Sequence, residues 1–201
     1  MKELYIARHG QDEDNAEGRL NGRRNRPLTE LGISQANTLA ENIKESGLNF
    51  KLILSSPLTR ALDTAKIIAK HLEMADPIVI DDLVERDLGI LAGKVIKEIP
   101  TEDQKMLITD TVNYFLEPDG AETFTQLLDR GGNVLKLIEK YDAPLVVAHG
   151  DIGKMIYASY YGLSWEEVLK GFHFGNSDLL YLAPDQDPKD SHKFKFQQHN
   201  S

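Results

Sequence analysis

Two histidine–glycine pairs each follow directly after an apolar run. The first is Arg8-His9-Gly10, which follows "LYIA", and the second is His149-Gly150, which follows "LVVA". A neutral imidazole is a nucleophile near pH 7, and a guanidinium binds phosphate through two parallel hydrogen bonds. The chain has only six histidines. Two such pairs therefore indicate one site that handles an anion with a histidine nucleophile.

Two further charged residues occupy comparable places. Ser56-Pro57 is typical of an N-cap followed by proline at the first helical position, and Arg60 then lies in the first turn. At about 100° per residue, Arg60 is off the apolar stripe of that helix. Taken alone, it is typical of a solvated arginine. Glu85 follows the apolar run "PIVI" and is a candidate proton carrier. A solvated acidic loop stays an alternative, because three other carboxylates are close in sequence: Asp81, Asp82 and Asp87.

Strands and helices alternate along the chain. We expect strands at 3–7, 51–55, 77–80, 144–148 and 178–183, and helices at 29–46, from 56–57 to about 72, at 124–138 and from about 151. This alternation predicts an α/β fold, a three-layer sandwich with a mostly parallel central sheet and helices on both faces. Active sites of such sheets lie beyond the carboxyl ends of the strands, where His9 and His149 are expected.

Length and composition restrict the class of protein. The 201 residues are 41% apolar and 27% charged, which is typical of a globular chain, and we expect one domain over 1–201. Within it, 94–120 is expected to be an insert that can act as a lid, and about 185–201 a polar tail. The net charge of −9 disfavours nucleic acid as a partner. There is no cysteine and no apolar run long enough for a bilayer, so we expect a cytoplasmic protein without a membrane partner.

An ordered set of motifs surrounds these residues. They are Arg8-His9-Gly10 with Asn15, then "RPLTELGISQA", "SSPLTRALDTA", "VERDLG", "PDGAETF" and "VVAHGD". In this order and on these elements, the motifs resemble the histidine phosphatase superfamily, branch 1, which is also called phosphoglycerate mutase-like. The resemblance extends from Leu4 to about Leu182. The chain departs from the usual family pattern at Gln11-Asp12, Asn21, Asn25, "GILAG" and Ala121.

The resemblance implies a role for each candidate residue. His9 would attack phosphorus and form a phosphohistidine, Arg8 and Arg60 would clamp the phosphoryl group, and His149, if protonated, would donate to an equatorial oxygen. Glu85 would give a proton to the leaving group and later take one from water. Asn15 and Asn21 join Arg8, Arg60 and His149 as substrate-binding residues. No metal and no cofactor is implied.

The reaction expected is hydrolysis of a small phosphorylated metabolite. Cofactor-dependent mutases of this family usually carry a basic insertion, whereas 94–120 holds three lysines against six carboxylates. That balance predicts a weak hold on a second anionic group, which repulsion from Glu117 and Asp119 would weaken further. The apolar residues of 106–116 either form an apolar wall of the site or are core-facing helix positions without contact to it. A phosphoglycerate mutase, a sugar-bisphosphatase fragment and a non-catalytic phospho-ligand-binding protein stay as alternatives. The expected partner is a small-molecule phosphate ester, and a homodimer stays open.

Two groups of residues remain without an assigned part in this chemistry. The loop 19–27, "RLNGRRNRP", is the one basic cluster, and it either attracts an anionic substrate or only solubilises the surface. The other four histidines are expected to be structural or surface residues: His71, His173, His192 and His199.

Overall fold

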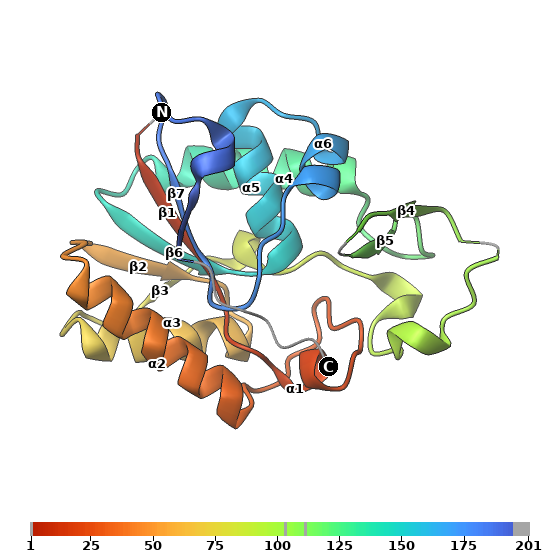
Figure 1. Ribbon diagram of the computed structural model, residues 1–201, viewed down its shortest axis with the longest axis horizontal. Coiled ribbons are helices and arrows are strands. Elements are labelled where there is room, and N and C mark those ends of the chain that lie inside the picture. Colours follow the sequence, from red (N-terminus) through yellow and green to blue (C-terminus); the bar gives the residue numbers. More distant parts are fainter. Residues whose placement is uncertain (1, 103, 111, 195–201) are drawn as a thin grey trace.

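A computed structural model describes residues 2–102, 104–110 and 112–194 (Figure 1). Its centre is a six-stranded sheet in the order β3-β2-β6-β1-β7-β8. The strands are β1 (Leu4–Arg8), β2 (Leu52–Ser55), β3 (Ile78–Val79), β6 (Pro144–Ala148), β7 (Leu179–Leu182) and β8 (His192–Phe194). The first four in the spatial order are parallel, whereas β7 and β8 are antiparallel to their neighbours. The expected mostly parallel sheet is confirmed.

Helices cover both faces of the sheet. The helices α2 (Glu30–Glu45) and α3 (Thr59–His71) lie on one face, and α4 (Phe124–Ile138), α5 (Gly150–Tyr161) and α6 (Trp165–Gly171) on the other (Figure 1). Consecutive strand residues point to opposite faces, so Ile6 joins the apolar core under α4 and α5, while Ala7 joins the core under α2 and α3. The α/β sandwich is confirmed; α6 and the short α1 (Glu13–Ala16) were not expected.

The helix α3 begins later than the sequence predicts. Its first residue is Thr59, and Leu58 occupies the N-cap position without a side-chain bond. The hydroxyl of the expected cap, Ser56, lies 2.7 Å from His149 Nε2, and it accepts the backbone N–H of Leu58 at 3.3 Å rather than one from the first helical turn. The cap of this helix end comes from a different segment: the side chain of Asn25 accepts a hydrogen bond from the Thr59 backbone N–H at 2.7 Å. The predicted serine cap is therefore wrong, and the loop before α2 replaces it.

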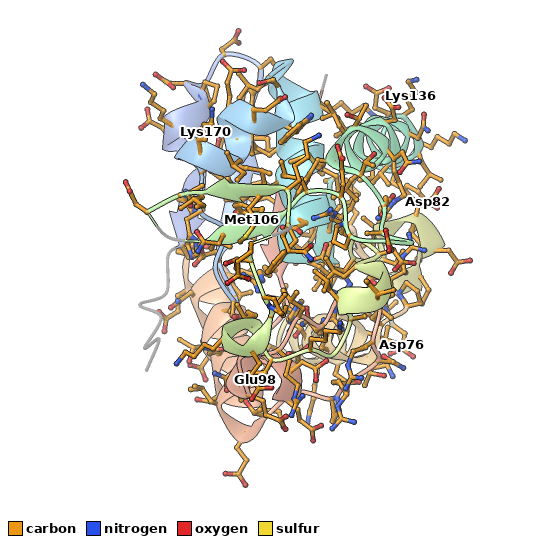
Figure 2. The ribbon with its side chains drawn as sticks, turned by 90° about the vertical axis from the view of Figure 1, so that its right-hand side faces the viewer. Asp76, Asp82, Glu98, Met106, Lys136 and Lys170 are labelled. Carbon is orange, nitrogen blue, oxygen red and sulfur yellow. The ribbon has the colours of Figure 1, made fainter. Side chains whose placement is uncertain are left out.

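The stretch between β3 and α4 leaves the sheet and returns. It holds 3₁₀ turns at Asp81–Leu83, Gly89–Leu91 and Ile96–Glu98, and an antiparallel hairpin of β4 (Met106–Ile108) and β5 (Asn113–Phe115). Figure 2 views the side of the molecule that carries this hairpin, with Met106 on β4 between Lys170 of α6 and Glu98. Residues 106–116 thus contain two strands, which excludes the alternative that they are core-facing helix positions.

Part of the expected polar tail is built into the sheet. A 3₁₀ turn at Pro188–Asp190 leads into β8, which pairs with β7 at the edge of the sheet. The expectation for 195–201, and for His199 within it, falls outside the described residues. No helix in the described part of the chain is long and apolar enough to cross a membrane.

The adjacent glycines in α4 provide a test of the packing between α4 and α5. A Cβ on Gly131 would lie 2.8 Å from the backbone C and O atoms of Met155, whereas a Cβ on Gly132 would meet only Ser159 Oγ, at 3.7 Å. We expect Gly131→Ala to lower the free energy of unfolding by about 1–3 kcal/mol, because two backbones would be forced apart. Gly132→Ala should raise it by about 0.5–1 kcal/mol through helix propensity.

Urea denaturation of both variants measures the two free energies, and each variant is the control for the other. Equal effects of the two substitutions would contradict a close approach of the helices at Gly131.

Candidate active site

The two histidine–glycine pairs meet because β1 and β6 are parallel neighbours. Arg8 is opposite Ala148 in the register, so the next residues, His9 and His149, leave the sheet side by side. Their ring centroids are 5.0 Å apart. His9 is 1% exposed to solvent and His149 is 0% exposed. Both histidines thus lie at the carboxyl end of the sheet, where the sequence places them.

The tautomer of His9 follows from its neighbours. Its Nδ1 lies 2.6 Å from the Gly10 carbonyl oxygen, which can only accept, so Nδ1 carries the proton. Its Nε2 accepts a hydrogen bond from Arg60 Nε at 3.1 Å. Burial, together with the charges of Arg60 and Arg8, lowers the pKa of His9 well below its ordinary value. The ring is therefore neutral near pH 7, with a lone pair on Nε2 that can attack an electrophile.

The guanidinium of Arg60 is completely buried beside His9. Its Nη1 and Nη2 donate to the backbone carbonyls of Arg24 and Gly22, at 2.7 and 2.8 Å. Its Nε lies 3.2 Å from a carboxylate oxygen of Asp12, and both side chains are 0% exposed. Arg60 is therefore not the solvated helix arginine of the alternative interpretation. Asp12, one of the departures from the family pattern, holds it in place, and sequence reasoning did not assign it this part.

The basic loop 19–27 has its own charges paired. Arg24 contacts Asp14 at 2.8 Å, Arg26 contacts Glu13, and Arg23 contacts Glu122 at 3.3 Å. The loop contacts the site through the backbone carbonyls of Gly22 and Arg24, which accept hydrogen bonds from Arg60. The sequence did not predict this contact.

The buried atoms Arg8 Nε and His149 Nδ1 have no hydrogen-bond partner within the described ranges. Arg8 is held through Nη1, which donates to the Phe174 carbonyl at 2.7 Å, and His149 is held through Nε2, which is 2.7 Å from Ser56 Oγ. Burial, with the charge of Arg60 next, lowers the pKa of His149 well below its ordinary value, so this ring is also neutral near pH 7. In the tautomer protonated at Nδ1, it can donate one hydrogen bond without a positive charge.

Glu85 is 8% exposed and faces the same end of the sheet. Its carboxylate accepts three backbone N–H bonds, from Arg86 at 2.8 Å and from Asp151 and Ile152 in the first turn of α5 at 3.1 and 3.0 Å. Burial, and then the negative charge of Asp151, outweigh these bonds and raise the pKa of Glu85 above its ordinary value. A carboxyl with a raised pKa can donate a proton at mildly acid pH.

The two asparagines occupy different positions. Asn21 lines the cavity at the site, and its Nδ2 donates to Asp12 at 2.8 Å. Asn15 is not among the lining residues; its side-chain oxygen accepts from Asn176 at 3.1 Å, and Asn176 also donates to the His9 carbonyl. Asn15 is therefore joined to the His9 backbone through Asn176.

A cavity of about 160 Å³ adjoins this group of residues. His9, Arg60 and His149 are not among its lining residues, because they are buried almost completely. Arg8, Glu85 and Asn21 form part of its lining, and residues of α5 and of the hairpin complete it. Tyr114 and Phe115 line it, as the sequence-based apolar wall requires. Glu117 and Asp119 do not, so the expected repulsion of a second carboxylate by these two residues is wrong.

Lys154 and His173 are among the lining residues that sequence reasoning did not assign to the site. Lys154, on α5, is 4% exposed and brings a positive charge that the lysine count of 94–120 left out. Its spacing of four residues from Gly150 on a helix is the signal that could have indicated it. His173 was expected to be structural or on the surface, but it also lines the cavity.

Arg86 fixes the hairpin over the cavity. Its three side-chain nitrogens donate to the carbonyls of Phe115, Leu116 and Glu122 at 2.7–2.9 Å, and the guanidinium lies 3.9 Å from the centre of the Phe124 ring. Arg86 is 1% exposed to solvent. Glu85 and Arg86 are therefore not members of a solvated acidic loop.

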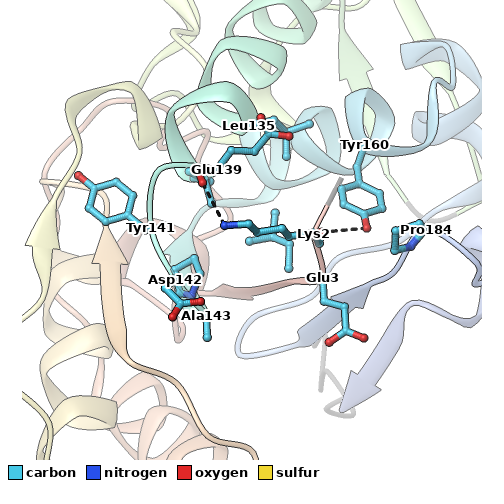
Figure 3. A pocket seen from close by; sticks show the side chains of 12 residues that line it. Lys2, Glu3, Leu135, Glu139, Tyr141, Asp142, Ala143, Tyr160 and Pro184 are labelled. Atoms are coloured by element: carbon cyan, nitrogen blue, oxygen red, sulfur yellow. Dashed lines mark hydrogen bonds between the residues drawn. The ribbon is translucent and has the colours of Figure 1, made fainter.

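A second, larger cavity of about 430 Å³ lies at the opposite end of the sheet (Figure 3). Lys2, Tyr160, Glu139 and Pro184 contribute to it, and two bonds bridge its wall, from Lys2 Nζ to the Glu139 carbonyl and from Tyr160 Oη to the Lys2 carbonyl. The described residues contain no cluster of three or more His, Cys, Asp or Glu side chains that could hold a metal ion. Of the charged residues at the carboxyl end of the sheet, Arg8, Glu85 and Lys154 line the smaller cavity and not this one.

Known proteins are similar to this chain in sequence. A metal-independent phosphoserine phosphatase of Arabidopsis thaliana is 34% identical over 162 residues, which are 78% of this chain and 68% of that protein. A probable phosphoglycerate mutase GpmB of Proteus mirabilis is 34% identical over 160 residues, 75% of this chain and 70% of that protein.

Solved structures are similar to this chain in fold. A phosphoserine phosphatase of Entamoeba histolytica, in complex with 3-phosphoglyceric acid, has a TM-score of 0.73 and 25% identity, with 90% of each chain covered. A mycobacterial glucosyl-3-phosphoglycerate phosphatase has a TM-score of 0.76 at 24% identity, with 91% of this chain and 93% of that chain covered, which shows a common fold. The family model of the histidine phosphatase superfamily (branch 1) matches residues 4–196, and the chain belongs to this family.

Proposed function

We propose that the protein is a phosphomonoesterase that hydrolyses a small phosphorylated metabolite through a phosphohistidine on His9. The observation that carries the proposal is the buried, neutral His9, whose Nε2 lies beside the Arg60 guanidinium while Nδ1 is protonated toward Gly10. Membership of the family and the phosphatase names of its relatives support the same reaction class. A cavity of about 160 Å³ suits a small alcohol part rather than a nucleotide.

The first step transfers the phosphoryl group to the enzyme. The Nε2 lone pair of His9 attacks phosphorus, the bond from phosphorus to the ester oxygen breaks, and Glu85 gives its proton to the leaving oxygen. Charge on the transferred group is spread over three equatorial oxygens, so catalysis depends on fixed cations and donors. Arg8 and Arg60 supply the cations. Arg8 Nε and His149 Nδ1, which lack partners among the described residues, are donors suited to phosphate oxygens.

The second step releases phosphate. Glu85, now ionised, takes a proton from a water molecule, the water oxygen attacks phosphorus, and the bond from phosphorus to His9 Nε2 breaks. The enzyme returns to its starting protonation state, with inorganic phosphate and an alcohol as products. A phosphoglycerate mutase is the second candidate, because relatives such as that of Proteus mirabilis carry this name. It would return the phosphoryl group to a second hydroxyl instead of to water.

A panel of phosphomonoesters tests the reaction and its nucleophile together. We expect release of inorganic phosphate by the wild type. Rapid acid-free quenching with ³²P-labelled substrate should leave an acid-labile, base-stable label on His9, and His9→Ala should abolish both label and turnover.

The same panel includes 3-phosphoglycerate with its bisphosphate cofactor. Isomerisation of 3-phosphoglycerate in preference to hydrolysis would contradict the phosphatase proposal, and a label on a different residue would contradict the role of His9. Circular dichroism of His9→Ala controls for loss of fold.

The pH dependence follows from the two pKa shifts. His9 stays neutral to a pH well below its ordinary 6.5, and Glu85 stays protonated to a pH above its ordinary 4.5. The value of kcat/KM should therefore be highest on the acid side of neutrality and fall as pH rises through the pKa of Glu85. Asp151→Asn removes a negative charge that raises this pKa, so its alkaline limb should move to lower pH. Titration of the substrate phosphate is common to both proteins, so the shift between their profiles is the measurement; an unchanged or opposite shift would contradict the role of Glu85.

Metal independence is a further expectation of this mechanism, because Arg8 and Arg60 supply the charge that a metal would otherwise bring. We expect the hydrolysis rate to be the same, within error, before and after dialysis against EDTA. A loss that Mg²⁺ or Zn²⁺ restores would mean that carboxylates near Glu85 act as metal ligands rather than as proton carriers.

A further inference from the structure

Lys154 is a buried cation that the proposed mechanism does not use. Its Nζ donates to Tyr114 Oη at 2.7 Å and lies 3.7 Å from Asp151 Oδ1, which is longer than a hydrogen bond. An ammonium has three N–H donors, and only one has an acceptor at hydrogen-bond distance among the described residues. Burial of an incompletely paired ammonium is costly, so a further acceptor is expected at this position.

The position of Lys154 relative to the phosphate groups is set by α5. His149 is the N-cap of this helix, and Gly150 lies beside Arg8, because a Cβ added to Gly150 would be in van der Waals contact with Arg8 Cζ at 3.4 Å. Lys154 follows four residues later on the same face, about 6 Å farther along the axis. Arg8 and Lys154 line the same cavity. A molecule whose phosphate is at Arg8 therefore faces Lys154 with atoms that lie a few bonds away.

The surroundings of Lys154 specify the charge of that acceptor. His173 also lines the cavity; burial, and then the charges of Lys154 and Arg8, lower its pKa, so it is neutral near pH 7. Its Nδ1 is buried without a hydrogen-bond partner in the described ranges. Tyr114 contributes a hydroxyl. Lys154 thus brings a positive charge to the cavity, with two neutral polar groups beside it and one carboxylate, that of Asp151, at 3.7 Å. Because Asp151 is beyond hydrogen-bond distance, Lys154 Nζ keeps donors that an anionic acceptor can use.

We propose that Lys154, with Tyr114 and His173, forms a carboxylate subsite that selects phosphomonoesters whose alcohol part carries a carboxylate a few bonds from the phosphate. This specificity rests on the proposed function of the same cavity. The class includes phosphorylated three-carbon hydroxy acids and amino acids, which share the carboxylate and differ in the group beside it. It reverses the sequence-based expectation of a weak hold on a second anionic group, because that expectation counted the charges of 94–120 and not those of α5.

Two matched substrate pairs test the subsite in the wild type. O-phospho-L-serine and O-phosphoethanolamine differ in one carboxylate, and 3-phosphoglycerate and glycerol 3-phosphate differ in a carboxylate against a hydroxymethyl group. We expect kcat/KM to be at least tenfold higher for the carboxylate member in at least one pair, which corresponds to about 1.4 kcal/mol. The pair with the larger ratio tells whether an amino acid or a hydroxy acid is preferred. Ratios near one in both pairs would overturn the proposal.

The variants separate recognition from a purely structural tie between α5 and the hairpin. Lys154→Gln removes the charge and keeps a donor for Tyr114, and Lys154→Met removes both. We expect each folded variant to lose most of the wild-type ratio, whereas a structural tie would change both members of a pair equally and leave the ratio as it was. Lys66→Met, at an exposed position on α3, is the matched control and should keep the ratio. Retention of the ratio in folded Lys154→Gln would overturn the proposal.

The wild-type ratios decide the proposal even where a variant fails to fold. Phenyl phosphate separates the two levels of inference. Hydrolysis of phenyl phosphate without a preference in either pair would refute the subsite alone. Absence of phosphate release from every substrate would refute the proposed function.

Discussion

Burial of a guanidinium is costly unless its N–H donors meet hydrogen-bond acceptors. The buried guanidinium of Arg60 therefore requires acceptors from the segments at the carboxyl end of the sheet. Two of its acceptors are the carbonyls of Gly22 and Arg24, which belong to the loop before α2. The loop must therefore fold back over the start of α3, where Asn25 also serves the helix end. Asp12 closes the arrangement with a buried ion pair. The conformation of this loop and the position of His9 Nε2 are consequences of one buried charge.

The junction of β6 with α5 concentrates several tasks in a few residues. The strand ends at Ala148, His149 follows as the N-cap, and the first turn of the helix gives two backbone N–H groups to Glu85. Free N–H groups at a helix start favour an anion, whereas burial and Asp151 act against it. The protonation of Glu85 is thus set by opposing effects within the same helix turn.

The sequence predicts those parts of the site that depend on strand ends. Parallel neighbours finish at the same edge, so His9 and His149 could be placed together from their apolar runs alone. The cap at Ser56 was predicted wrongly because propensity favours serine there, while the folded protein uses the hydroxyl for His149. Lys154 could not be recognised by its type, since lysine on a helix is usually exposed. Its burial depends on the hairpin that carries Tyr114, and periodicity did not resolve the two short strands of 106–116. Asp12 was missed for a related reason, because its partner Arg60 is distant in sequence.

The bonds of Arg86 determine how the site exchanges its contents with solvent. Lifting the end of the hairpin would break the bonds to Phe115 and Leu116 and leave a guanidinium uncovered above an aromatic ring. Any opening of this segment during ligand exchange would therefore have to offset the loss of these charge-assisted hydrogen bonds.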